Sequence, residues 1–171
     1  MDPLTCPKCR SQFVRRVGRD GAVERLLSVC YVYPFRCQIC ELRFKRLRWG
    51  ERYVRVELDR RDFSRVATSL WAAVVWQGHQ SQATVRDLSV AGCWLEIDAP
   101  IPVGELLRLT LEPEDEAPIH VEVAEVRSVQ GGRAGVRFVR VEPVHRERLC
   151  QTVADLLTAA PPASPPGALS G

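Results

Sequence analysis

The sequence predicts a mainly β protein, a six-stranded antiparallel β-barrel with a C-terminal α-helix, preceded by a small cysteine-rich module. Three observations predict this fold class. Five of the seven cysteines lie within the first 50 residues, and the segment after them alternates between apolar and polar residues. Near residue 149 the alternation gives way to a helical period. A period of two is typical of strands that bury one face, so the long second segment is expected to be β-sheet.

Seven segments after residue 52 have the strand pattern, and about six of them are expected to pair into a small antiparallel barrel. In one of them, Leu107, Leu109 and Leu111 fall on the same face. Turns are expected at "GHQSQ", at a tight corner containing Gly92, and at "QGGR", whose paired glycines favour a hairpin. The expected strands span residues 53–58, 67–78, 81–89, 92–98, 105–113, 119–129 and 134–141.

The C-terminal segment changes from a strand pattern to a helix pattern. Its apolar residues Leu149, Val153, Leu156 and Leu157 have the i, i+4, i+7, i+8 spacing of an amphipathic helix, and Pro161 ends it. The remaining tail is rich in proline, alanine, serine and glycine, and is expected to be disordered. The predicted domains are a cysteine-rich module at 1–50, an arm at 51–66, the barrel and helix at 67–158, and the tail at 159–171.

The bulk composition favours a cytoplasmic protein. The start "MDPLTCPKCR" has an acid and two cysteines instead of a signal peptide's apolar core, and no apolar run has the length of a membrane span. A net charge of +3 among 171 residues is too small to indicate nucleic acid by itself. Because the cytoplasm keeps thiols reduced, the cysteines are expected to include metal ligands rather than to form disulfides.

The cysteine pairs predict a closed metal site. Cys6 and Cys9 in "CPKC" and Cys37 and Cys40 in "CQIC" form two C-x2-C knuckles. Four thiolates fill all positions around a tetrahedral Zn(II), so the ion is expected to be structural and to hold a zinc ribbon together. A redox-active C-x-x-C pair is the alternative. The 27 residues between the pairs imply an insertion, largely "DGAVERLLSVCYVYPF".

The sequence supports further interpretations of this module and of the remaining cysteines. Neither knuckle has glycine after its second cysteine, since Arg10 and Glu41 stand there, which makes each turn less ideal without removing a ligand. Cys30, Cys93 and Cys150 lie on apolar patterns and are expected to be buried thiols. The segments "CRSQFVRRVGR" and "RFKRLRWGER" combine arginines with aromatics, which suits nucleic acid, but a solvated surface is favoured. The apolar "LLSVCYVYPF" fits a partner surface as well as a core.

Two short motifs in the second region point to a ligand. "RRDFSR" places Arg61 and Arg65 at R-x-x-x-R spacing, and "DLSVAG" follows with Asp87, Ser89 and Gly92. Alone, the first would be a plain linker and the second an ordinary turn with capped amides. Their joint occurrence, with "GVRF" at 135–138, resembles the PilZ domain, the bacterial receptor module for cyclic di-GMP. The resemblance covers about residues 52–158 and implies a PilZ-like barrel.

The chemistry of these residues fits that ligand. The guanidinium groups of Arg61 and Arg65 can pair with phosphate oxygens or with guanine O6 and N7. The carboxylate of Asp87 can accept from guanine N1–H and N2–H, which distinguishes guanine from adenine. Ser89 can bond a phosphate, and Gly92 allows a tight turn under the ligand. The preceding Arg60 can add a contact and makes a stacked pair of ligands conceivable.

The resemblance implies a receptor that binds rather than catalyses, and no catalytic constellation accompanies the scattered histidines His79, His120 and His145. The expected partners are cyclic di-GMP and an unidentified protein, with nucleic acid the less favoured alternative. Ligand capture is expected to change how the zinc ribbon is arranged relative to the barrel. The other hypotheses are a PilZ-fold adaptor that does not bind nucleotide, and a nucleic-acid-binding ribbon regulated by the barrel.

Overall fold

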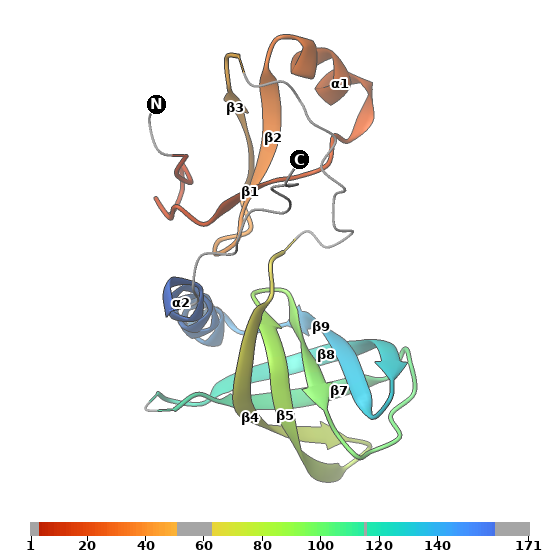
Figure 1. The fold of residues 1–171 in the computed structure, drawn as a ribbon. Coiled ribbons are helices and arrows are strands. Elements are labelled where there is room, and N and C mark those ends of the chain that lie inside the picture. Colours follow the sequence, from red (N-terminus) through yellow and green to blue (C-terminus); the bar gives the residue numbers. More distant parts are fainter. Residues whose placement is uncertain (1–3, 51–62, 115, 160–171) are drawn as a thin grey trace, which may run out of the picture.

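The computed structural model describes residues 4–50, 63–114 and 116–159, which form a small N-terminal sheet and a larger closed barrel (Figure 1). The barrel is antiparallel, with strand order β4-β5-β6-β9-β8-β7, which confirms the predicted fold class. The expected strand at 53–58 lies outside the described residues. The barrel elements are β4 (Val66–Trp76), β5 (His79–Ser89), β6 (Gly92–Glu96), β7 (Leu106–Glu112), β8 (Ile119–Gln130), β9 (Arg133–Arg140) and helix α2 (Pro143–Ala159).

Two-residue turns connect two of the strand pairs. Between β8 and β9, Gly131 and Gly132 have φ angles of 54° and 72°, as the paired glycines predict. Between β4 and β5, Gln77 and Gly78 have φ angles of 48° and 81°, and β5 resumes at His79. The longer turn expected at "GHQSQ" is therefore wrong. Two successive positive φ angles match the twist of the flanking strands, and Gln77 takes one of them although its side chain disfavours it.

The barrel core comes from the inward-facing residues of the six strands and from one face of α2. Leu107, Leu109 and Leu111 are all buried, as their alternation predicts. Helix α2 covers one end of the barrel with Leu149 and Val153, both fully buried. Burying a side chain of this size stabilises the folded state by about 1.5–3 kcal/mol. The helix is therefore part of the barrel's core.

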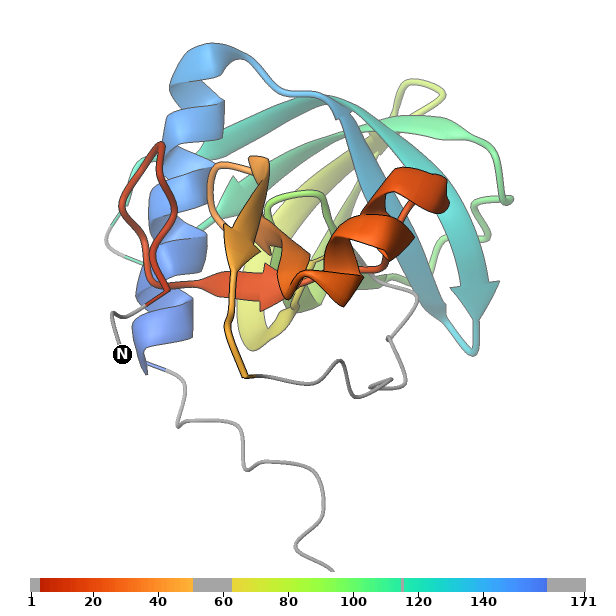
Figure 2. The ribbon, with the colours of Figure 1, turned by 90° about the horizontal axis from the view of Figure 1, so that it is seen from above.

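The N-terminal module is a three-stranded sheet with one helix, and the segment expected as an insertion supplies the helix and most of the central strand (Figure 2). Arg43 ties the helix to the sheet edge, since its guanidinium donates to Asp20 Oδ2 at 2.5 Å and to Glu24 Oε2 at 2.7 Å. The elements are β1 (Val14–Arg16), α1 (Gly21–Val29), β2 (Val32–Cys37) and β3 (Arg43–Leu47), in the order β1-β2-β3.

The apolar core of this module is small. Tyr33 and Phe35 on β2 are its large buried side chains. The Phe35 ring lies 6.1 Å from that of Phe44, and the Arg16 guanidinium lies 4.3 Å above the Tyr33 ring. A core of this size rarely stabilises a segment of fewer than about 70 residues without a metal or disulfides.

The outer face of α1 is apolar and exposed. Val23, Leu26 and Val29 are each at least two-thirds exposed and form a stripe along the helix. The expected burial of Cys30 is wrong: Cys30 is exposed, because α1 ends there and Tyr31, with a φ of 60°, turns the chain into β2. The stretch "LLSVCYVYPF" is thus surface in its first half and core in its second. Neither helix of the described residues has the length and apolar content needed to span a bilayer.

Candidate functional site

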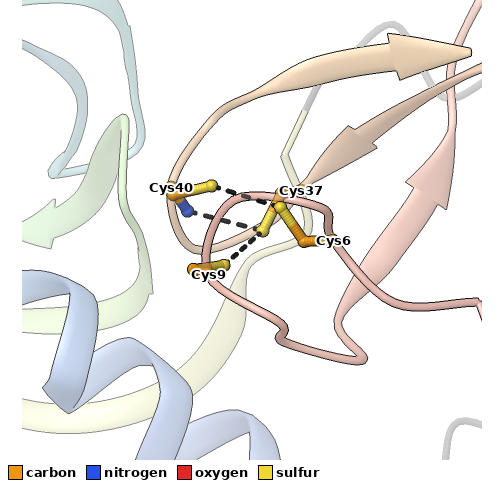
Figure 3. Close-up of side chains that lie close together, drawn as sticks. All are labelled: Cys6, Cys9, Cys37 and Cys40. Carbon is orange, nitrogen blue, oxygen red and sulfur yellow. Dashed lines mark hydrogen bonds between the residues drawn. The ribbon is translucent and has the colours of Figure 1, made fainter.

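The four cysteines of the two knuckles converge at the end of the N-terminal sheet (Figure 3). The Sγ atoms all lie within 4.8 Å of one another, with Cys6 and Cys40 at 3.5 Å and Cys9 and Cys37 also at 3.5 Å. Tetrahedral zinc with Zn–S bonds near 2.3 Å places its thiolates about 3.8 Å apart. The donor set and its spacing therefore fit a zinc ion.

The backbone of the knuckles surrounds these thiols with N–H donors. The N–H groups of Ile39 and Cys40 point at the sulfur of Cys37, at 3.4 and 3.5 Å. Burial nevertheless raises the pKa of both Cys37 and Cys40. At Cys6, burial acts in the same direction, but hydrogen bonds from the backbone N–H groups of Cys9 and Lys8, together with those from the thiols of Cys40 and Cys9, outweigh it and lower the pKa to about 7. Since thiolates are the metal-binding form, zinc must displace the remaining thiol protons.

The residues that follow each knuckle have the left-handed backbone conformation that favours glycine. Arg10 has a φ of 59° and Glu41 a φ of 61°. The sequence therefore places side chains where the turn is easiest for glycine, at a cost of about 1–2 kcal/mol each.

We expect Arg10→Gly to stabilise the zinc-loaded module by about 0.5–1 kcal/mol, because relief of the left-handed strain exceeds the entropy that glycine adds to the unfolded chain. Competition with a chromophoric chelator should show zinc affinity raised about threefold. Glu41→Gly is the matched comparison and should gain less, because it loses the ion pair of Glu41 Oε2 with Arg146 at 2.5 Å. Equal gains in both variants would contradict the role of this ion pair.

The two ligand motifs meet at the rim of the barrel. Arg65 Nη1 donates to Asp87 Oδ1 at 2.9 Å, although the residues are 22 positions apart. The same carboxylate oxygen accepts from the backbone N–H of Trp94 at 3.1 Å. Arg65 stands just before β4, and Asp87 lies near the end of β5, so strand pairing at the start of the barrel brings the motifs together.

Ser89 and Gly92 form the corner between β5 and β6. The buried Ser89 hydroxyl donates to the carbonyl of Gly92 at 2.9 Å, which leaves its oxygen lone pairs for an incoming donor. A Cβ at Gly92 would lie 2.2 Å from the carbonyl oxygen of Val136 on β9. Glycine is thus required by the close approach of β9, and not by the turn conformation that the sequence suggested.

A hollow of about 420 Å³ lies beside this corner. Arg65, Ser89 and Gly92 line it, together with Arg127 on β8 and Arg137 on β9. A second hollow of about 560 Å³ is lined by Asp87 and Trp94, among other residues. The Arg65–Asp87 ion pair joins a residue of the first hollow to a residue of the second.

Comparison with known proteins decides the family. A family model described as the PilZ domain matches residues 59–155, more than half of the chain. The chain belongs to the PilZ domain family. A search of curated proteins finds no match.

Two solved structures share the fold of this chain. The chain is 16% identical to YcgR of Escherichia coli in complex with c-di-GMP, with a TM-score of 0.51 over 85% of this chain and 74% of that one. It is 16% identical to the Bacillus subtilis inhibitor of motility, MotI/DgrA, with a TM-score of 0.52 over 75% of this chain and 74% of the other. At these identities the likeness establishes the fold.

The other residues singled out in the sequence have varied surroundings in the PilZ structure. Arg60 and Arg61 lie outside the described residues. The rings of His120 and His145, 25 positions apart in the chain, lie 4.6 Å apart edge to face. Sequence periodicity gives no sign of that pairing.

Arg127 and Arg137 line the first hollow, and the sequence motifs did not indicate either of them. They lie on opposite strands of the β8–β9 pair and both donate to Glu125, at 2.9 and 2.6 Å. Hydrogen bonds from these two arginines hold the pKa of Glu125 below its ordinary value. The sequence held one indication of Arg137: the alternation in "GVRF" places this residue on the outward face of β9.

The PilZ barrel contacts the cysteine module through α2. Arg146 donates to the backbone carbonyl of Val90 at 3.1 Å as well as to Glu41. The half-buried thiol of Cys150 donates to the carbonyl of Ile39 in the second knuckle at 3.2 Å. Cys93, by contrast, is fully buried in the barrel, as predicted. Helix α2 therefore lies between the two cysteine knuckles and the barrel core (Figures 1 and 3).

Proposed function

We propose that this chain is a cyclic di-GMP receptor whose ligand-binding residues are Arg60, Arg61, Arg65, Asp87, Ser89 and Gly92. One observation carries the proposal: Arg65 and Asp87 come together at the rim of two adjoining hollows on a PilZ barrel. The structure of a fold relative, YcgR, is described in complex with c-di-GMP, which makes the same ligand the first candidate here.

The chemistry of binding is an exchange of partners at the ion pair. Asp87 presents a carboxylate to guanine N1–H and N2–H, and Arg65 presents a planar fork to a phosphate. In the structure Arg65 and Asp87 bind each other. The ligand must therefore break this ion pair and replace it with two charged contacts, one to each residue. Ser89 can accept through its free lone pairs. The positive charges of Arg127 and Arg137, shared with Glu125, add attraction for a dianionic ligand.

The four-cysteine cluster is proposed as a structural zinc site. The spacing of the Sγ atoms and the small apolar core of residues 4–50 support this. When bound, zinc would supply cross-linking and not chemistry, since four thiolates leave no open position. Cys6, Cys9, Cys37 and Cys40 would hold it.

The direct test is isothermal titration of cyclic di-GMP into the full zinc-loaded chain. Saturable binding at micromolar or lower concentration, not reproduced by GMP or cyclic AMP, is the expected result. The stoichiometry will show whether Arg60 recruits a second, stacked ligand. No binding at saturating nucleotide would overturn the proposal in favour of an adaptor that acts through protein contacts.

The receptor is proposed to transmit binding by changing the arrangement of its two modules. The arm that holds the arginines joins them, and α2 contacts both. A partner protein could read this change on the ribbon, where Val23, Leu26 and Val29 form an exposed apolar stripe.

We expect small-angle X-ray scattering of the zinc-loaded chain to change when saturating cyclic di-GMP is added. The shift arises because the ligand stabilises one arrangement over the other by its difference in affinity for the two. Superimposable profiles at saturation would contradict the rearrangement while leaving nucleotide binding intact.

A further inference from the structure

The second cysteine knuckle reaches the arm of the nucleotide site through Gln38, the residue between Cys37 and Ile39. Gln38 is only 5% exposed. Its Oε1 accepts a hydrogen bond from the backbone N–H of Ser64 at 2.6 Å. Ser64 belongs to the "RRDFSR" motif and immediately precedes Arg65. A side chain inside the metal-binding loop thus holds the backbone next to the ligand-binding arginine.

Gln38 is itself held on its other sides. Its backbone N–H donates to the carbonyl of Phe13 at 2.8 Å, and its Nε2 donates to the carbonyl of Arg36 at 3.3 Å. The backbone of Gln38 is therefore held by the chain that follows the first knuckle, and its buried amide by β2. Its orientation depends on the loops that the four cysteines bring together.

A second contact joins the same two segments. The guanidinium of Arg36 lies 5.3 Å above the ring of Phe63. Phe63 and Arg65 both line the 420 Å³ hollow, with Ser64 between them. Both contacts of the cysteine module with residues 63–64 thus act on the chain just before Arg65.

We propose that Gln38 positions the backbone immediately before Arg65, so that metal binding at the four cysteines and nucleotide binding on the barrel strengthen each other. This inference rests on the proposed function. An arm that is already ordered loses less conformational entropy when the ligand binds, which raises affinity. Because linkage is reciprocal, the nucleotide must raise zinc affinity by the same factor as zinc raises nucleotide affinity.

The first experiment compares Gln38→Leu with Gln38→Glu in the full chain. Leucine keeps the size but removes the acceptor for Ser64 N–H, whereas glutamate keeps an acceptor there. We expect cyclic di-GMP to bind about tenfold more weakly to the leucine variant and within about twofold of wild type to the glutamate variant. Arg46→Ala, on the exposed end of β3, is the matched control and should bind as wild type. Zinc content, measured with a chromophoric chelator, should remain one per chain in all four proteins.

The second experiment uses the unmodified chain and measures zinc affinity by chelator competition, with and without saturating cyclic di-GMP. If Gln38 carries the whole coupling, zinc affinity should rise by the same factor as nucleotide affinity falls in the Gln38→Leu variant, about tenfold. If the Gln38→Leu variant fails to retain zinc, the zinc affinity of the unmodified chain alone tests the coupling between the two sites. The positioning role alone is overturned if the wild-type chain binds cyclic di-GMP but its zinc affinity does not change. It is also overturned if the Gln38→Leu variant binds cyclic di-GMP as tightly as the wild-type chain. A wild-type chain that binds no cyclic di-GMP instead overturns the proposed function.

Discussion

The double variant Arg61→Ala/Arg65→Ala is expected to bind cyclic di-GMP at least about a hundredfold more weakly than the wild-type chain. Each guanidinium contributes charge-assisted hydrogen bonds worth about 1.5–3 kcal/mol. Removing Arg65 also removes the cation that lies 2.9 Å from Asp87, so the negative charge of the carboxylate would repel the dianionic ligand without compensation. Isothermal titration in the presence of zinc measures the loss.

Two comparison variants make this result specific. Arg140→Ala removes an arginine that is 74% exposed and lies 3.9 Å from Glu122, away from both hollows, and should bind normally. Arg65→Lys keeps the charge but not the planar fork, and should fall between wild type and the double variant. Wild-type affinity in the double variant would mean that these arginines are a solvated linker.

Replacing Cys37 with serine is expected to abolish stable zinc binding and to unfold the cysteine module. The side chain of Cys37 is fully buried at the end of β2, in contact with Cys9 across the two knuckles. Zinc binding at such sites is worth about 10–16 kcal/mol, far more than the small apolar core around Tyr33 and Phe35 supplies. Loss of zinc content and rapid proteolysis of the first 50 residues would report it, while the barrel keeps its own thermal transition.

Cys30→Ser is the matched control for this experiment. Cys30 belongs to the same module but is exposed and stands outside the four-cysteine cluster. Its replacement should leave zinc content and protease resistance unchanged. Zinc retained by Cys37→Ser, or lost from Cys30→Ser, would contradict the assignment of ligands.

Local patterns were enough to predict the barrel and the clustering of the four cysteines. The glycine pair at 131–132, the alternating leucines of β7 and the two C-x2-C knuckles each depend on residues close together in the chain. The turn at Gln77 was misplaced because its strain is offset by the pairing of β4 with β5, a tertiary effect. Cys30 was misjudged because an apolar stretch does not reveal where a helix ends.

The candidate site was predictable only in part, because it too depends on contacts between residues far apart in the chain. The motifs named Arg65 and Asp87, but their ion pair depends on strand pairing at the start of the barrel. Arg127 and Arg137 reach the same hollow only because β8 and β9 pair. The bond between Gln38 and Ser64 spans 26 residues and two modules, and no periodicity in the sequence encodes it.

The contact between Glu41 and Arg146 has a consequence for how the protein assembles during translation. These residues are 105 positions apart, so α2 is made well after the chain around Glu41. All four cysteines, by contrast, are present once the first 40 residues have been synthesised. At about 5–20 residues per second, the ribbon can capture its metal roughly 5–20 s before α2 exists to receive it. The N-terminal module would then fold before the barrel is complete, and its docking on α2 would be the last step in folding.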